Sequence, residues 1–275
     1  ILRVFFVTGT VPASAMPPHG HEKEHEGRRK KGACFHSSDE GWQHRVATVK
    51  PSWFYNWAPD VPARSPQIDD VEFVPMVWGG KAKVSERLEG IKKMHRDGMC
   101  RHVLAFNEPD GADQANMTVE EALEHWPLFE AMDGLTLGSP AAAHADKDWM
   151  KCFMKGCHSN CHRVDFVAVH WYGEPIPEKF FRWLHEVHEL YDKPIWITEF
   201  AVADWEAKTH DANRFSAEKV QEFMREVLPR LDKLQFVKRY AWFSFKPEHQ
   251  EGHCSALYKA DGRNLTKLGE IYANH

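Results

Sequence analysis

Two glutamates stand where short apolar runs of the chain end, and a pair of such carboxylates could cleave a glycosidic bond. The run at 102–106 stops at Asn107 and Glu108, and the run at 194–198 stops at Glu199. A proline follows Glu108, and because proline has no N–H, it ends a central strand there. One carboxylic acid would protonate the leaving oxygen, and one carboxylate would attack the anomeric carbon or activate water. This chemistry requires no cofactor and no metal.

Eight strand-like apolar runs recur along the chain, mostly separated by stretches with the 3.6-residue spacing of amphipathic helices. The runs are 32–36, 52–57, 72–78, 101–107, 135–141, 164–172, 194–199 and 239–245. This alternation predicts an α/β fold, a single closed (β/α)8 TIM barrel over residues 32–275. An open doubly wound sheet is the alternative, but no Gly-rich phosphate turn follows the first run. The proline-rich segment 58–71 predicts a long loop without a helix.

The C-terminal ends of barrel strands meet at one rim, which carries the active site in proteins of this architecture. Because side chains alternate along a strand, His170 and Tyr172 should face the same way. By the same alternation we expect Ile195, Ile197 and Glu199 to share one face, with His170 and Tyr172 beside Glu199. A tyrosine O–H next to a carboxylate favours its ionised form. Aromatic side chains crowd the same strand ends, at Tyr55, Trp57, Trp78, Tyr172 and Trp242.

Composition and charge limit the classes of protein to which the chain can belong. The chain has 275 residues and 11 tryptophans, which either fill a large core or stack on sugar rings in a cleft. The net charge of −5 gives no basic footprint for nucleic acid. Residues 1–15 look like the tail of a secretory signal peptide, with a fragment of an ordinary strand as the alternative. Residues 16–31 predict a disordered leader. No other stretch approaches a membrane span. From the signal-peptide pattern we expect a secreted, extracellular or cell-wall protein, and we expect it to be a monomer.

Six ordered motifs resemble glycoside hydrolase family 128, a group of clan A (β/α)8 retaining enzymes associated with endo-β-1,3-glucanase activity. They lie at 53–57, 74–79, 104–109, 165–173, 195–200 and 240–243, and the resemblance covers about residues 31–275. It implies β-glucan polysaccharide or oligosaccharide as the substrate and no cofactor. Glu108 would be the acid/base, Glu199 the nucleophile, and Asn107 a ligand of the sugar 2-hydroxyl. His170 and Tyr172 would orient the nucleophile and the sugar. The stacking platforms would be Tyr55, Trp57, Trp78 and Trp242.

The chain has six cysteines, which fit an oxidising compartment. Relatives in the resembled family often carry a cysteine pair before the sixth strand, which suggests a disulfide between Cys157 and Cys161. Cys34 and Cys254 could also meet, because the first and eighth strands are neighbours in a closed barrel. A zinc site that includes Cys152 is a weaker interpretation. The sequence leaves the pairing open.

Two other functions fit the same residues. A non-catalytic β-glucan-binding protein would keep the aromatic cleft, although the presence of both glutamates argues against it. A clan A hydrolase of another β-glycan would share the strand motifs, because loops set the subsites. Release of reducing sugar separates the first alternative from an enzyme. The sequence does not distinguish endo from exo cleavage.

Overall fold

The computed structural model of the protein describes residues 30–61, 70–81 and 83–275. Strands and helices alternate through these residues, and each predicted apolar run overlaps one strand. The strands are β1 Lys31–Cys34, β2 Trp53–Tyr55, β3 Glu72–Phe73, β4 His102–Val103, β5 Thr136–Leu137, β6 Val167–Gly173, β7 Ile195–Val202 and β8 Val237–Trp242. The helices are α2 Trp42–Val49, α3 Val84–Arg96, α4 Val119–Glu130, α5 Asp148–Ser159, α6 Pro177–Tyr191, α7 Ala217–Lys233 and α8 Lys267–Asn274, with short 3-10 turns η1 His210–Ala212 and η2 His253–Ser255.

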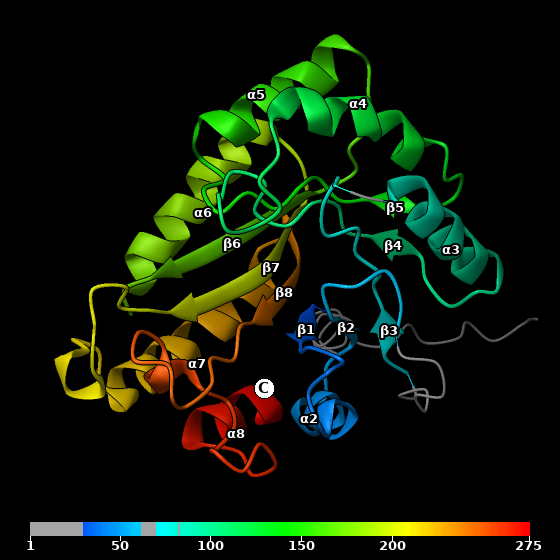
Figure 1. The fold of residues 1–275 in the computed structure, drawn as a ribbon. Coiled ribbons are helices and arrows are strands. Elements are labelled where there is room, and N and C mark those ends of the chain that lie inside the picture. Colours follow the sequence, from blue (N-terminus) through cyan, green and yellow to red (C-terminus); the bar gives the residue numbers. More distant parts are fainter. Residues whose placement is uncertain (1–29, 62–69, 82) are drawn as a thin grey trace, which may run out of the picture.

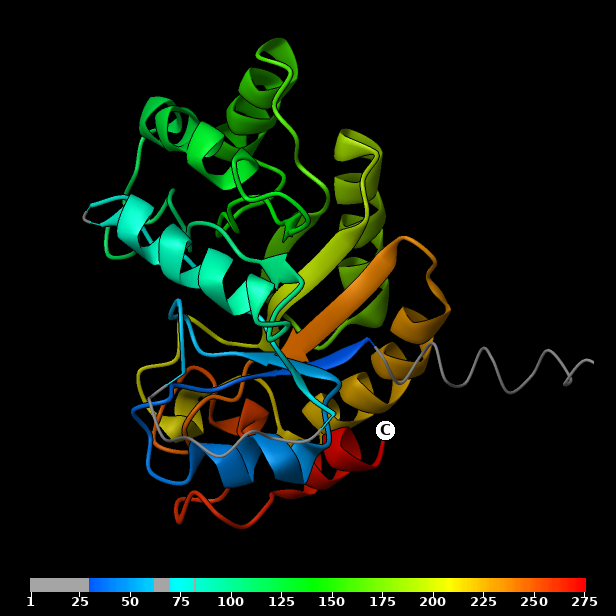
Figure 2. The ribbon, with the colours of Figure 1, turned by 90° about the vertical axis from the view of Figure 1, so that its right-hand side faces the viewer.

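All strand pairs among these eight strands are parallel, and the pairings close into a ring. Six strands pair in the order β3-β2-β1-β8-β7-β6, and β4 pairs with β5. Single parallel bridges complete the circle, from Met76 to Leu104 and from Gly138 to Phe166. The helices lie outside the strands in both views (Figure 1) (Figure 2). The predicted (β/α)8 architecture is therefore confirmed.

Two apolar layers follow from the alternation of side chains along the strands. The interior cluster includes Trp53, Phe166 and Trp196, and the rings of the last two stack with centroids 4.1 Å apart. The outer layer packs the other strand faces against the helices. The interior is thus filled with side chains and leaves only the rim open for a site.

The helices bury most of the residues on the faces that their spacing predicts, although Met94 of α3 and Tyr191 of α6 are only half-buried. Val84, Leu88 and Ile91 of α3 are buried, and the helix ends two residues before Gly98, whose φ is +76°. A capping box of Thr118 and Glu121 begins α4. For α4 the 3.6-residue spacing predicts a face of Val119, Leu123 and Trp126. The buried residues are Ala122, Trp126 and Phe129, whereas Val119 and Leu123 are only half-buried.

An ionic cluster lies among the interior side chains at the N-terminal ends of the strands. Glu72 Oε1 lies 2.6 Å from His102 Nδ1, and Glu72 Oε2 accepts a 2.5 Å hydrogen bond from Arg239. The Arg239 guanidinium lies 4.2 Å from the centroid of the Trp196 ring and 5.5 Å from that of Trp53. This cluster covers the interior tryptophans at the end of the barrel opposite the rim.

The ends and loops bear on three predictions. The predicted signal-peptide remnant and most of the leader lie outside the described residues, and β1 starts at Lys31, one residue before the predicted start of the barrel. The described parts of the 58–71 loop hold no helix, and residues 62–69 lie outside the described structure. In the part of the chain that the structure describes, no helix has the length and hydropathy to span a membrane.

Candidate active site

Glu108 follows β4 with its backbone in the left-handed region, at φ +41°. The conformation is uncommon for a residue with a side chain and costs energy unless neighbours hold it. Its N–H donates to the Ala141 carbonyl at 2.7 Å, and its own carbonyl accepts from Gly111 at 2.9 Å. Trp57, at the end of β2, has φ +58°. Both residues leave the strand direction where they enter the rim, and such strain is typical of functional sites.

Glu199 reaches the rim because of an irregularity in β7. Ile195 and Ile197 face the helices, whereas Trp196 belongs to the interior cluster. The register against β6 then shifts, so that Val169 pairs with Ile197 and His170 with Glu199. This bulge turns Glu199 inward. The prediction that Ile195, Ile197 and Glu199 share a face is therefore wrong, although His170 and Tyr172 do lie beside Glu199.

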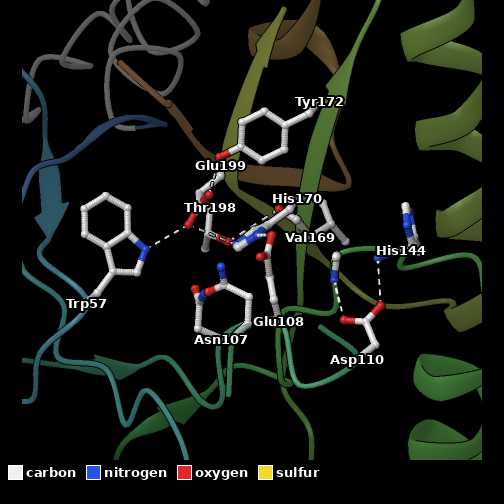
Figure 3. Close-up of polar contacts among 12 residues, drawn as sticks. Trp57, Asn107, Glu108, Asp110, His144, Val169, His170, Tyr172, Thr198 and Glu199 are labelled. Atoms are coloured by element: carbon white, nitrogen blue, oxygen red, sulfur yellow. Dashed lines mark hydrogen bonds and ion pairs between the residues drawn. The ribbon is translucent and has the colours of Figure 1, made fainter. Parts of the chain in front are cut away.

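Three neutral donors hold the Glu199 carboxylate. Oε1 accepts hydrogen bonds from the Tyr55 hydroxyl at 3.1 Å and from the Trp57 indole N–H at 2.8 Å. Oε2 accepts a hydrogen bond from Tyr172. Figure 3 shows Trp57 and Tyr172 approaching the carboxylate from different sides. Burial and the Glu199 charge raise the pKa of both tyrosines well above 10, so they remain donors. Donors to a carboxylate favour its ionised form.

Glu108 has a different environment. Its Oε1 lies 2.8 Å from His170 Nδ1. Burial pushes the pKa of Glu108 upward, but the hydrogen bond from His170 and the charges of His170 and His144 outweigh burial and keep the pKa below its ordinary value. Asp110 fixes the adjacent loop by accepting from the backbone N–H groups of Ala143 and His144. Glu108 thus faces a basic partner, whereas Glu199 faces hydroxyl and indole donors.

The two carboxylates are close together. One oxygen of each and one nitrogen of His170 all lie within 4.8 Å of one another. Among the described residues this is the only group of three or more acidic, histidine or cysteine ligands that could hold a metal ion. A cation would compete with the three donors that already bind Glu199. The absence of a metal stays a prediction.

The carboxylates lie in an open cleft of about 1020 Å³. Asn107 is buried at its base, where its Nδ2 donates to Gln114 at 3.4 Å. Its Oδ1 has no hydrogen-bond partner among the described residues. An unpaired buried acceptor beside Glu108 is suited to a sugar hydroxyl. The predicted role of Asn107 at the 2-hydroxyl stays a prediction.

Of the four predicted stacking platforms, only two are placed in the cleft where a sugar ring could reach them. Trp57 and Trp78 line the cleft. Tyr55 is fully buried and donates to Glu199, so it cannot stack on a sugar. Trp242 is 1% exposed, and its indole N–H donates to the Ser255 carbonyl in the core. The prediction is wrong for both residues. Trp242 faces outward on β8 because Ala241 belongs to the interior cluster.

Several cleft residues lie outside the predicted set. Phe243 occupies the inward position after Trp242 and lines the cleft, and strand parity could have identified it. Trp183 comes from α6 and Trp205 from the loop after β7, where no strand-end rule applies. The tryptophans divide between the core and the cleft, and their stacking on sugar rings stays a prediction. Five are buried in the core, namely Trp42, Trp53, Trp126, Trp196 and Trp242, and five line the cleft, namely Trp57, Trp78, Trp171, Trp183 and Trp205.

All six cysteines are free, so the suggested disulfides are wrong. Cys157 is buried on the core face of α5, whereas Cys161 is exposed two residues beyond the helix, at φ +57°. Cys34 belongs to the barrel interior and donates to the Trp242 carbonyl, whereas Cys254 donates to Phe215 outside the ring. The side chains of each suggested pair therefore lie in different layers.

A parallel barrel with two carboxylates at its rim, 4.8 Å or less between their nearest oxygens, in a cleft with aromatic walls, is the architecture of a glycoside hydrolase. The profile of the family described as glycosyl hydrolase catalytic core matches residues 32–272. The chain belongs to this family, and within it to glycoside hydrolase family 128, as the following relatives indicate.

Alkali-sensitive linkage protein 1 of Schizosaccharomyces pombe is 30% identical over 254 residues, which are 88% of this chain and 44% of that protein. The chain thus spans less than half of this relative. A family 128 subgroup I endo-β-1,3-glucanase from Amycolatopsis mediterranei, solved with laminarihexaose, is 33% identical with a TM-score of 0.77, covering 90% of this chain and 99% of that one. A subgroup III curdlan-specific exo-β-1,3-glucanase from Blastomyces gilchristii is 29% identical with a TM-score of 0.69, covering 91% and 100%.

Proposed function

We propose that the protein is a retaining endo-β-1,3-glucanase in which Glu108 is the acid/base and Glu199 the nucleophile. The close approach of the two carboxylates, within 4.8 Å, carries this proposal. Retaining enzymes hold their carboxyl groups about 5–5.5 Å apart, whereas inverting enzymes need about 6.5–9.5 Å to admit a water molecule. The spacing therefore favours direct attack by a carboxylate on the sugar.

The environments of the two residues assign the roles. Three neutral donors bind Glu199, which suits a carboxylate that must be ionised to attack the anomeric carbon. In the first step Glu199 forms a bond to that carbon while Glu108 transfers a proton to the departing oxygen. In the second step Glu108 accepts a proton from water, which attacks the same carbon and releases Glu199. Two inversions give net retention.

The relatives support the substrate class, and of the two glucanases described above, the more similar one is the endo-acting enzyme. The Amycolatopsis enzyme is an endo-β-1,3-glucanase solved with laminarihexaose or laminaritriose, and its structures include variants of two different glutamates. The cleft of this chain is open and has tryptophans from three loops, from β6 and from α6 along its walls, which suits a glucan chain that enters sideways. An exo enzyme needs a wall that closes one end.

A substrate panel tests the proposal. The wild type and Glu199→Gln are incubated with linear β-1,3-glucan, β-1,4-glucan and β-mannan, and reducing ends are measured. We expect the wild type to cleave only the β-1,3 polymer, with a mixture of oligosaccharides as the early products, and the variant to lose at least 100-fold in rate, in line with the factor of about 10²–10⁴ that one catalytic group contributes. Early release of glucose alone would contradict the endo mode, and near-normal turnover of Glu199→Gln would contradict the assignment of the nucleophile.

We also propose that the protein acts outside the cell, at the cell wall. The signal-peptide pattern of residues 1–15 supports secretion. Immunodetection of the mature protein in the culture medium or wall fraction is the expected result. Retention of the intact N-terminal segment in a cytoplasmic pool would contradict it.

A further inference from the structure

His170 is held between the two catalytic carboxylates (Figure 3). Its side chain is 1% exposed, and it projects from β6 into the base of the cleft. Nδ1 lies 2.8 Å from Glu108 Oε1, and Nε2 lies 3.4 Å from Glu199 Oε1 at an ion-pair distance without hydrogen-bond geometry. Nε2 has no hydrogen-bond partner among the described residues. Each ring nitrogen therefore faces an acidic group.

This geometry limits where protons can reside. An ionised carboxylate only accepts hydrogen bonds, so an unprotonated Nε2 would hold its lone pair only 3.4 Å from the negatively charged Glu199 Oε1, with no donor between them. Nε2 thus carries a hydrogen. The contact between Nδ1 and Glu108 also needs one proton, either on the nitrogen or on the oxygen. Two states of equal net charge result: imidazolium with ionised Glu108, and neutral imidazole with protonated Glu108.

We propose that His170 stores the catalytic proton of the resting enzyme and transfers it to Glu108 when substrate is bound. This inference rests on the proposed function, because it assumes that Glu108 is the acid. In this account His170 is a positioning residue with a second task, since it acts on the sugar only through Glu108. It goes beyond orienting the nucleophile because it specifies the group that holds the proton.

The transfer balances without an external reagent. The Nδ1–H bond of the imidazolium breaks, its electron pair stays on nitrogen, and an O–H bond forms on Glu108 Oε1. Glu108 then passes this proton to the leaving oxygen as the glycosidic bond breaks. Water attack in the second step returns one proton to Glu108, and Nδ1 takes it back. The hydrogen on Nε2 stays in place throughout, beside Glu199.

The charges around the ring favour storage on His170. Burial lowers the pKa of His170, but the charges of Glu199, Glu108 and Asp110, together with the hydrogen bond to Glu108, raise it above its ordinary value. His144, on the loop after β5, contributes to lowering the pKa of Glu108. Tyr172 and Tyr55 stay neutral on the Glu199 side. A lone carboxylic acid would lose its proton well below neutral pH, whereas His170 and Glu108 together keep one shared proton to a higher pH.

Nuclear magnetic resonance of 15N-labelled histidine tests the resting state without any substrate. The spectrum of His170→Asn identifies the His170 signals among those of 18 histidines. We expect both ring nitrogens of His170 to be protonated at pH 7, and Glu108→Gln to lower the pH at which the ring loses a proton. A neutral His170 ring at pH 7 would overturn the proposal. Failure of the substrate panel would leave this result interpretable on its own.

The pH profile of kcat/KM tests the transfer. The alkaline limb of the wild type should report the shared proton, whereas in His170→Asn it should report Glu108 alone. The amide of the variant still donates toward Glu108. We expect its alkaline limb to move at least one pH unit to the acid side, which is a loss of about tenfold per unit moved at pH values above both limbs. An equal loss at every pH, with both limbs unmoved, would show a purely structural role and overturn the proposal. His158→Asn, which changes an exposed histidine of α5, is the matched control.

Discussion

The ionic cluster at the barrel floor makes a quantitative prediction for Glu72→Gln. Burial raises the pKa of Glu72, but the hydrogen bonds and charges of His102 and Arg239 lower it from 4.5 to about 2. The side chain of Glu72 is only 20% exposed, so water screens these contacts little. Removing its charge leaves the Arg239 guanidinium buried against tryptophans without a counter-charge.

The magnitude follows from proton linkage. A pKa that is lower in the folded state stabilises the fold above the unfolded value of 4.5, and this stabilisation disappears as the pH falls through about 2. At about 1.4 kcal/mol per pH unit, the difference corresponds to about 3 kcal/mol at neutral pH. We therefore expect Glu72→Gln to lower the free energy of unfolding by about 3 kcal/mol at pH 7 and by roughly half of that at pH 3.

Urea unfolding followed by tryptophan fluorescence at pH 7, 5, 4 and 3 measures this difference. Glu89→Gln, at an exposed ion pair on α3, is the control and should change stability little at any pH. If Glu72→Gln lowered the free energy of unfolding by the same amount at every pH, the reasoning would be refuted. The wild type should lose the same interaction when Glu72 is protonated at low pH, so the difference between the two proteins should shrink there.

Three further predictions concern the site and the thiols. Trp57→Phe removes the indole donor to the nucleophile and should lower kcat by about 10- to 100-fold, from about 1.5–3 kcal/mol for a hydrogen bond to a charged group; an unchanged kcat on β-1,3-glucan would contradict the role of this donor. Trp205→Ala removes a wall that is 55% exposed and should raise KM several-fold with kcat preserved, whereas a fall in kcat alone would argue against a binding role. Cys152 and Cys161 are exposed and Cys34 is buried, with its thiol pKa raised well above 9 by burial and the Glu199 charge. Alkylation of the folded protein, mapped by mass spectrometry, should therefore label Cys152 and Cys161 but not Cys34, and labelling of Cys34 first would contradict the burial.

The barrel could be predicted from the sequence because its signal is repeated. Each strand needs a short apolar run, and each amphipathic helix, such as α3 or α7, needs one apolar stripe. Local patterns therefore already define the layer of strands and the layer of helices. The predictions exceeded the observed lengths of β3, β4 and β5, where only two residues each form the ladder and single bridges continue it. Side chains such as those of Met76 and Leu104 remain in place there, although the regular pairing is lost.

The site was predictable as far as strand direction sets it, and no further. Glu108 and Glu199 could be identified because strand ends meet at one rim. The bulge before Glu199 could not be predicted from the sequence, because an extra residue in a strand leaves no mark on hydrophobic alternation. By contrast, side-chain alternation along β8 could have identified Phe243 in place of Trp242. Trp205 lies on a loop, whose course depends on tertiary contacts that local sequence does not encode.

Trapping the covalent intermediate directly tests whether the enzyme is retaining and whether Glu199 is its nucleophile. A 2-fluoro laminaribioside with a good leaving group forms the glycosyl-enzyme but hydrolyses it slowly, and peptide mapping by mass spectrometry then locates the label. We expect one sugar adduct per protein, on Glu199, and a β-configured first product from the natural polymer. An adduct on Glu108, or an α-configured first product without any adduct, would contradict this expectation.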